Sequence, residues 1–208
     1  MRMATWNLNH RNRIDGQAAG LRLQGDLGAD LLFVQESRSP SCNGSSVWEA
    51  VPGGDWGSAI LLAEGKIDAK SVEGYGGWVV GGEVRDSPLN THGRSLLAFS
   101  IHSPTRNKTH GRTDYVAEVV KILEIIKRHR SIDTDLILGG DFNFLSLGKR
   151  VDSESLSTTP AEEKAMQVFE ELVLVSCWTT AAPNQPSAQT LRWSTHPPVP
   201  PHFSSQLV

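Results

Sequence analysis

The sequence predicts an α/β fold built from mixed β-sheets, and three observations support this prediction. Apolar segments of strand length outnumber the amphipathic segments of helix length. Several strand-like segments follow one another before the first long helix-like segment, whereas regular alternation would indicate one parallel sheet. The length of 208 residues, with 38% hydrophobic and 21% charged residues, fits one large domain better than two.

Predicted strands dominate the first half of the chain, where they cover residues 3–9, 30–36, 57–64, 76–84 and 94–104. A helix marked by Leu21, Leu23 and Leu27 precedes the second of these strands. That second strand contains an uninterrupted apolar run, which is typical of a strand buried on both faces. A loop rich in Ser, Pro and Gly follows it.

The second half contains two predicted helices and one strand. Apolar residues recur at helical spacing over 115–131, and a strand over 133–143 follows. A further helix is predicted over 159–178, because Thr159 is suited to cap its N-terminus and Pro160 to open its first turn. Residues 179–208 are rich in Pro, Ser, Thr and Gln, so we expect no helix or central strand there and place the folded domain at 1–178.

Bulk composition restricts the classes of function. The net charge of −3 gives no strongly basic surface, so any contact with nucleic acid must be local. The cysteines Cys42 and Cys177 are far apart in sequence and indicate neither a zinc site nor a disulfide framework. No apolar run approaches the roughly 20 residues of a membrane span, and the N-terminus lacks the pattern of a signal peptide. We therefore expect a cytoplasmic protein.

Polar side chains end four of the predicted strands. They are Asn7, Glu36, His102 and the pair Asp141 and Asn143. Alone, each is more commonly a strand-end cap or a solvated polar residue. Strand ends and their loops are, however, where α/β proteins place ligand sites, so we expect these residues to share one cleft.

Such a set of side chains favours the chemistry of phosphoesters. Carboxylates and amide oxygens make a site that suits Mg²⁺ or Mn²⁺ better than zinc. An asparagine can donate N–H groups to phosphate oxygens or orient a water, and a histidine can protonate a leaving oxygen. The pattern therefore predicts metal-assisted hydrolysis of a phosphoester.

The segment "GGDFN" at residues 139–143 is the most distinctive of these strand ends. Its glycines permit a close backbone approach or a positive φ, where a larger residue would crowd a substrate. In extended backbone, Asp141 and Asn143 share one face while Phe142 points to the other and can anchor in the core.

In this order, the segments "TWNLN", "FVQE", "WGSAIL", "SIHSP" and "GGDFN" resemble the endonuclease/exonuclease/phosphatase superfamily of DNase I-like metal-dependent phosphoesterases. The resemblance runs from Ala4 to Phe144 and implies a four-layer α/β/β/α sandwich of two mixed sheets, with Mg²⁺ or Mn²⁺ as cofactor. It implies that Glu36 binds the metal and that Asn7 lies on the metal or phosphate side. It further implies that His102 acts on the phosphate as acid or stabiliser. Asp141 is implied to orient the attacking water or bind metal, and Asn143 to bind the scissile phosphate.

Members of the superfamily end with further strands that carry an Asp and an Asp-His pair, and this sequence has no Asp after Asp152. We therefore expect a domain that is incomplete at its C-terminus, with residues 179–208 as the start of the missing part. Loss of the general base is expected to lower the rate. Two functions follow: a Mg²⁺-dependent phosphoester hydrolase of nuclease, phosphodiesterase or phosphatase type with impaired activity, or a non-catalytic relative that binds a phosphorylated partner.

The substrate stays open among DNA, RNA, an inositol phosphate and a lipid head group, and the oligomeric state is open too. The basic segment "TRNKTHGR" at 105–112 is a candidate contact for a phosphate backbone, and a solvated loop is an equally supported alternative. Arg94 and Tyr115 are further candidates for substrate contact, against a solvated arginine and an aromatic packed on the sheet.

Overall fold

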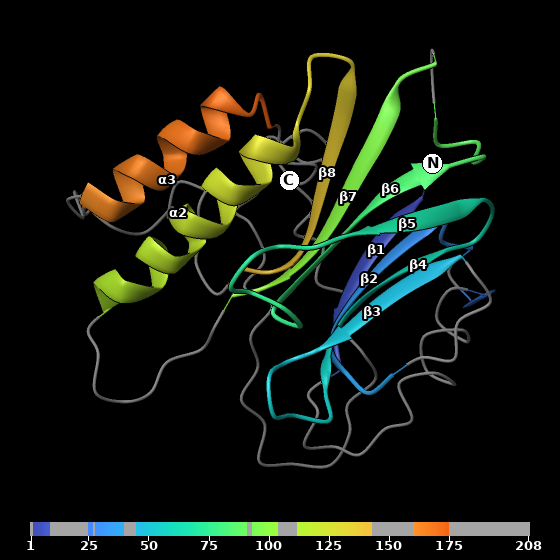
Figure 1. The fold of residues 1–208 in the computed structure, drawn as a ribbon, viewed down its shortest axis with the longest axis horizontal. Helices are drawn as coiled ribbons and strands as arrows, with labels where there is room; N and C mark the ends of the chain where they lie inside the picture. Colours follow the sequence, from blue (N-terminus) through green and yellow to red (C-terminus); the bar gives the residue numbers. More distant parts are fainter. Residues whose placement is uncertain are drawn as a thin grey trace.

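The computed structural model describes residues 2–8, 25–26, 28–39, 45–90, 93–103, 112–142 and 160–174, with 112–115 described in their backbone only. Within these ranges the chain forms two four-stranded sheets and two helices (Figure 1). None of the described helices combines the length and the hydropathy of a membrane-spanning segment.

The first sheet has the strand order β1-β2-β4-β3. Its strands are β1 (Met3–Asn7), β2 (Leu31–Ser37), β3 (Ser46–Ala50) and β4 (Gly57–Leu62). The pair β1 and β2 is parallel, whereas β4 is antiparallel to both β2 and β3. The sheet is therefore mixed, and the carboxyl ends of β1 and β2 lie together at one edge.

The second sheet has the strand order β5-β6-β7-β8. Its strands are β5 (Lys66–Lys70), β6 (Val79–Arg85), β7 (Ser95–His102) and β8 (Thr134–Asp141). The first three pair antiparallel, and β8 is parallel to β7 in a register that places His102 beside Asp141. This sheet too is mixed, as predicted, and the carboxyl ends of β7 and β8 coincide.

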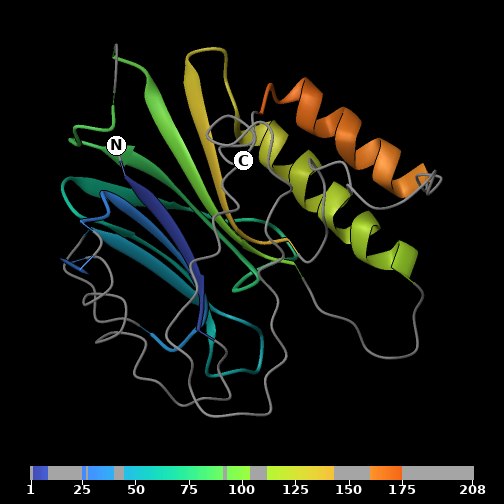
Figure 2. The ribbon, with the colours of Figure 1, turned by 180° about the vertical axis from the view of Figure 1, so that it is seen from behind.

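The helices α2 (Arg112–His129) and α3 (Pro160–Glu171) pack side by side on the outer face of the second sheet. Figures 1 and 2 show both helices on the side of β7 and β8, away from the first sheet. The described residues thus form the helical layer and the two sheets of the predicted sandwich. The helix expected before β2 falls mostly outside the described ranges.

Strand β7 carries apolar residues on both of its faces, because both faces are covered. Leu96 and Ala98 point into the layer between the sheets, where Phe33 packs against them, while Phe99 and Ile101 point toward the helices. All five side chains are at most 4% exposed. A strand covered on both sides reads as a continuous apolar run, which explains the pattern "SLLAFSI".

The helix predicted over 159–178 is shorter in the structure and ends at Glu171. Val173 adopts a left-handed conformation with a φ of 52°, and Leu174 N–H donates to Phe169 C=O at 3.0 Å. These features form a Schellman motif, which terminates a helix without requiring glycine. The predictions also omitted two short strands, β3 and β5. The sequence of β5, "KIDAK", is charged and partly exposed, so it resembles a surface loop.

Candidate functional site

Four of the five predicted site residues lie together where the two sheets meet. Asn7 Nδ2 donates to Glu36 Oε1 at 3.0 Å and to Asp141 Oδ2 at 3.1 Å. His102 Nε2 lies 3.7 Å from Glu36 Oε1. The structure thus joins the carboxyl ends of β1, β2, β7 and β8, as expected. Asn143 lies outside the described residues, so its placement stays a prediction.

Three of these side chains reach the site by simple strand alternation. Side chains two residues apart on a strand share a face. Asn7 lies two residues after Thr5, and His102 lies two residues after Ser100. Asp141 lies four residues after Ile137 on β8. The side chains of Thr5, Ser100 and Ile137 face the layer between the sheets. The inter-sheet layer therefore ends in a cluster of polar groups instead of apolar ones.

Glu36 reaches the site only because β2 is bulged. Its even-numbered neighbours Leu32 and Val34 pack on the outer face of the first sheet, where alternation would also place Glu36. The pairing of β2 with β4 shifts register between Val34 and Ser37, and Glu36 adopts a φ of 53°. A bulge of this kind re-aims a side chain, and here it turns the Glu36 carboxylate toward Asn7.

The backbone conformation of Glu36 carries strain. A residue with a Cβ atom in the left-handed region costs on the order of 1 to 3 kcal/mol, and such residues gather at functional sites. The bulge therefore keeps a carboxylate in place at a cost to stability.

His102 is enclosed by two tryptophans that the sequence analysis did not select. Its side chain is 2% exposed, stacks on Trp78 at a centroid distance of 5.4 Å with planes 10° apart, and meets Trp56 edge-on at 5.8 Å. The His102 backbone N–H also donates to Trp78 C=O at 2.8 Å. These contacts orient the imidazole toward Glu36. The available signal was the pair of glycine-flanked tryptophans in "DWGS" and "GGWV".

The two glycines of "GGDFN" permit a close backbone approach, and Gly140 a positive φ, as predicted. A Cβ atom on Gly139 would lie 2.2 Å from the ring of Phe33, and one on Gly140, which has a φ of 149°, would lie 1.9 Å from Ile101 O. They therefore allow close packing of β8 against Phe33 and against the backbone of β7. Phe142 is anchored in the core as predicted, 2% exposed and edge-on to Phe169.

Arg94 lies away from the site, contrary to its candidacy as a phosphate contact. It precedes β7 and so stands at the opposite end of that strand from His102. Arg94 Nε pairs with Asp135 at 2.9 Å, and Nη2 donates to Ile132 C=O at 3.0 Å. The side chains of Tyr115 and of the basic segment 105–112 lie outside the described residues.

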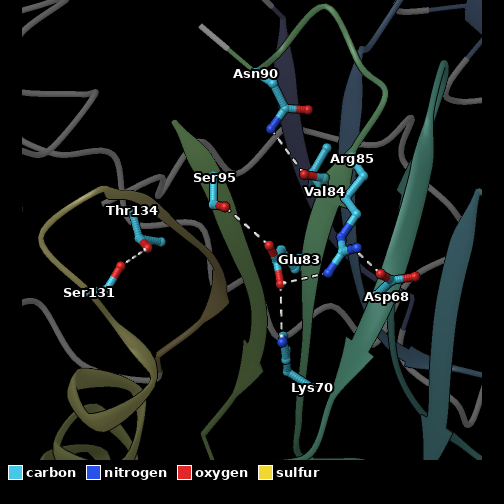
Figure 3. Close-up of polar contacts among 9 residues, drawn as sticks. All are labelled: Asp68, Lys70, Glu83, Val84, Arg85, Asn90, Ser95, Ser131 and Thr134. Carbon is cyan, nitrogen blue, oxygen red and sulfur yellow. Dashed lines mark hydrogen bonds and ion pairs between the residues drawn. The ribbon is translucent and has the colours of Figure 1, made fainter. Parts of the chain in front are cut away.

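A second group of charged side chains lies at that same far end of the second sheet (Figure 3). Glu83 pairs with Lys70 at 3.1 Å and accepts from Ser95 at 3.1 Å, and Arg85 pairs with Asp68 at 3.0 Å. The hydrogen bond from Lys70 lowers the pKa of Glu83, with Ser95 and Arg85 adding to the effect against burial. Because acids and bases alternate and pair, this group reads as a structural ladder across strands.

The residues at the site include oxygen donors of the kind that bind a hard divalent cation. In the described part of the chain, no group of three or more His, Cys, Asp and Glu side chains is arranged as a metal site. The predicted set differs in kind, because it combines two carboxylates with an amide. The Asn7 amide lies between the carboxylates of Glu36 and Asp141, where two like charges favour a positive partner. Oxygen donors of this type suit Mg²⁺ or Mn²⁺.

No protein-family model matches the sequence, and no curated protein is significantly similar to it. Solved structures do match its fold. An AP endonuclease from Archaeoglobus fulgidus is 15% identical, over 89% of this chain and 76% of that chain, with a TM-score of 0.59. The endonuclease domain of TRAS1, a telomere-specific non-LTR retrotransposon, is 17% identical over 85% and 74%, with a TM-score of 0.52.

A third similar structure is D. rerio TDP2 complexed with a single-strand DNA product. It is 15% identical over 99% of this chain and 81% of that chain, with a TM-score of 0.51. At such low identities the likeness concerns the fold. The order of mixed sheets and motifs predicted this architecture, and the chain has the same DNase I-like α/β fold as these structures.

Proposed function

We propose that this protein is a divalent-cation-dependent hydrolase of phosphoester bonds, with its site at Asn7, Glu36, His102 and Asp141. One observation carries the proposal: a single amide, Asn7, bridges carboxylates that belong to different sheets. Two carboxylates have no structural reason to meet at the end of an apolar layer, but a cation site requires them. The shared fold with two endonucleases and TDP2 supports the same reaction class.

The position of each residue in the site suggests its role in hydrolysis. Glu36 and Asn7 would hold Mg²⁺ or Mn²⁺, which when bound stabilises the charge that develops on the phosphoester oxygens. Asp141, beside Asn7, orients the attacking water or contacts the cation. His102 Nε2 faces Glu36, so a protonated imidazole adds positive charge beside the carboxylate and the phosphate. Asn143 follows Asp141 by two residues and is proposed to bind the scissile phosphate.

The test is hydrolysis of bis(p-nitrophenyl) phosphate with Mg²⁺ or Mn²⁺. Asp141→Asn keeps the shape of the side chain and removes its charge, and should lower the rate by about 100-fold or more. Asp135→Asn is the matched control, because Asp135 lies on the same strand but pairs with Arg94 at the far end. Equal rates in wild type and Asp141→Asn would show that Asp141 has no part in hydrolysis.

We propose nucleic acid as the first substrate class to test. The AP endonuclease and the TRAS1 endonuclease domain share the fold, and TDP2 has been solved with a single-strand DNA product. Cleavage of DNA with and without an abasic site, and of RNA, compares the candidates directly. Hydrolysis of an inositol phosphate or a lipid head group in place of nucleic acid would overturn this choice.

A second candidate function is binding of a phosphorylated partner without turnover. The arrangement of Asn7, Glu36, Asp141 and His102 would serve such a protein too, by holding a cation and a phosphate group. Calorimetry with bis(p-nitrophenyl) phosphate and Mg²⁺ distinguishes the two functions. Binding with no release of p-nitrophenol, in wild type and Asp141→Asn alike, supports the non-catalytic function.

We further propose that residues 1–178 form the functional domain and that the protein works in the reducing cytoplasm. The second proposal rests on two cysteines, Cys42 and Cys177, that are too few and too distant in sequence for a disulfide framework. Thiol titration of the purified protein under native and denaturing conditions checks it, and a disulfide between them would contradict it.

A further inference from the structure

A buried chain of side-chain hydrogen bonds lies directly beneath the site, between the two sheets. Thr5 Oγ1 donates to Gln35 Oε1 at 3.2 Å, Gln35 Nε2 donates to Ser100 Oγ at 3.0 Å, and Ser100 Oγ donates to Val34 C=O at 3.2 Å. Thr5, Gln35 and Ser100 are 4%, 1% and 0% exposed. We call these three residues the buried relay.

The buried relay has a fixed relation to the candidate site. Thr5 lies two residues before Asn7, and Ser100 lies two residues before His102, each on the same strand face. Gln35 immediately precedes Glu36. The relay therefore ties together β1, β2 and β7, which carry three of the four described site residues.

A polar group at this depth calls for an explanation. Burying an amide without hydrogen-bond partners destabilises the fold, and apolar residues would fill the same space without that cost. Met3, Phe33 and Ala98, each two residues before a member of the relay on the same strand, fill the layer between the sheets with apolar side chains. A buried polar network in which every group is hydrogen-bonded is rigid and fixes one arrangement of its side chains. Such rigidity serves a functional site, whose groups must keep defined positions.

The residues on both sides of Glu36 are held in place. Gln35 C=O accepts from Leu8 N–H at 2.9 Å, in addition to the side-chain bonds of the relay. Ser37 C=O accepts from Trp48 Nε1 at 3.3 Å, and Ser37 Oγ donates to Gly57 C=O at 3.5 Å. Glu36, between these anchors, takes the strained left-handed backbone. Persistent strain requires that its surroundings over-determine the conformation.

We infer that Gln35 is a positioning residue for Glu36, and that the buried relay holds the Glu36 carboxylate and the Asn7 amide in the arrangement that binds a divalent cation. The inference rests on the proposed function, because it takes Glu36 and Asn7 as ligands. Residues that support metal ligands in this way typically change metal affinity by about 10- to 100-fold when they are replaced.

The experiment measures Mn²⁺ affinity by isothermal titration calorimetry and stability by urea unfolding. Gln35→Leu removes both bonds of the amide, and Thr5→Val removes one hydroxyl with nearly unchanged shape. Both should weaken Mn²⁺ binding by about 10-fold or more, while Thr5→Ser, which keeps the hydroxyl, should restore it. Thr134→Val is the matched control, because Thr134 is also buried and bonds Ser131 at the other end of β8.

The outcomes separate the inference from the proposed function. A loss of stability without loss of Mn²⁺ affinity in Thr5→Val and Gln35→Leu, as expected for Thr134→Val, would overturn the positioning role. If Gln35→Leu fails to fold, Thr5→Val against Thr5→Ser decides the question alone. Wild-type Mn²⁺ affinity in Glu36→Gln would overturn the proposed function itself, and the inference with it.

Discussion

The side-chain amide of Asn7 donates a hydrogen bond of 3.1 Å to the carboxylate of Asp141, although the two residues lie 134 positions apart and in different sheets. The same amide also donates to Glu36 at 3.0 Å. One side chain thus joins the polar ends of both sheets. The geometry of the candidate site therefore depends on how the sheets pack against each other.

Replacement of Asn7 should separate the two carboxylates from their shared donor. Asn7→Ala is expected to lower the free energy of unfolding by about 1 to 3 kcal/mol, because both acceptors lose a partner. Added Mg²⁺ should stabilise the wild-type protein but not this variant, since ligand binding to the native state raises its stability. Urea unfolding with and without Mg²⁺ measures both effects.

The control for Asn7 is Asn90→Ala. Asn90 Nδ2 donates to Val84 C=O at 3.0 Å at the far end of the second sheet, so its loss should lower stability and leave the effect of Mg²⁺ intact. Full stabilisation by Mg²⁺ in Asn7→Ala would remove Asn7 from the cation site.

Strain at Glu36 predicts an inverted order of stability for two small substitutions. At an ordinary strand position alanine is more stable than glycine by about 0.5 to 1 kcal/mol, because glycine loses more backbone entropy. At Glu36, with its φ of 53°, the order should be reversed: Glu36→Gly should be more stable than Glu36→Ala by about 1 kcal/mol. Asp68, which is exposed on β5, should show the ordinary order. Urea unfolding of the four variants gives the comparison, and an ordinary order at both positions would mean that Glu36 is unstrained.

Close packing of Gly139 predicts a coupling with Phe33. Gly139→Ala should destabilise the protein by about 1 to 3 kcal/mol, because the new methyl group would lie within 2.2 Å of the Phe33 ring. Phe33→Leu removes that ring edge, so the double variant should be more stable than the sum of the single effects implies. Strict additivity in a double-mutant cycle, measured by thermal unfolding, would show that the two residues do not interact.

The ion pair between Lys70 and Glu83 predicts a pH dependence of stability (Figure 3). The pKa of Glu83 is lowered in the folded state, chiefly by the hydrogen bond from Lys70. A lowered folded-state pKa contributes stability above the unfolded value, and this contribution disappears as the pH falls through the folded value. Wild type should therefore exceed Lys70→Met in stability at neutral pH, and the difference should shrink below pH 4.5, the ordinary value for Glu.

Urea unfolding of both proteins across this pH range checks the prediction, with Arg38→Met as the control because Arg38 pairs with the exposed Asp55. A stability difference between wild type and Lys70→Met that persists unchanged at pH 3 would assign the effect of Lys70 to packing of its methylene groups instead.

The sequence alone predicts those parts of the site that follow from strand alternation. Asn7 and Asp141 end strands whose apolar pattern is legible, and alternation places both side chains on the inner face. Glu36 could not be oriented in this way. Its orientation depends on a bulge in the pairing of β2 with β4, and such pairing involves residues that are distant in the sequence.

The surroundings of the site were harder to predict for the same reason. The enclosure of His102 depends on Trp56 and Trp78, which directly precede β4 and β6, so no pattern local to β7 reveals it. The buried relay likewise uses residues from three strands. Two signals were available: Gln35 directly follows the apolar run "LLFV", and Ser100 is a polar residue inside "LLAFSI".

The most direct test of the central claim is the initial rate of phosphodiester hydrolysis as a function of Mg²⁺ concentration, in wild type and in Glu36→Gln. Glu36 accepts from Asn7 and faces His102, so its carboxylate is the centre of the proposed cation site. The rate should rise with Mg²⁺ and saturate in wild type, and Glu36→Gln should lose this dependence together with most of the rate. Hydrolysis that proceeds equally without a divalent cation, or with the same Mg²⁺ dependence in Glu36→Gln, would contradict the claim.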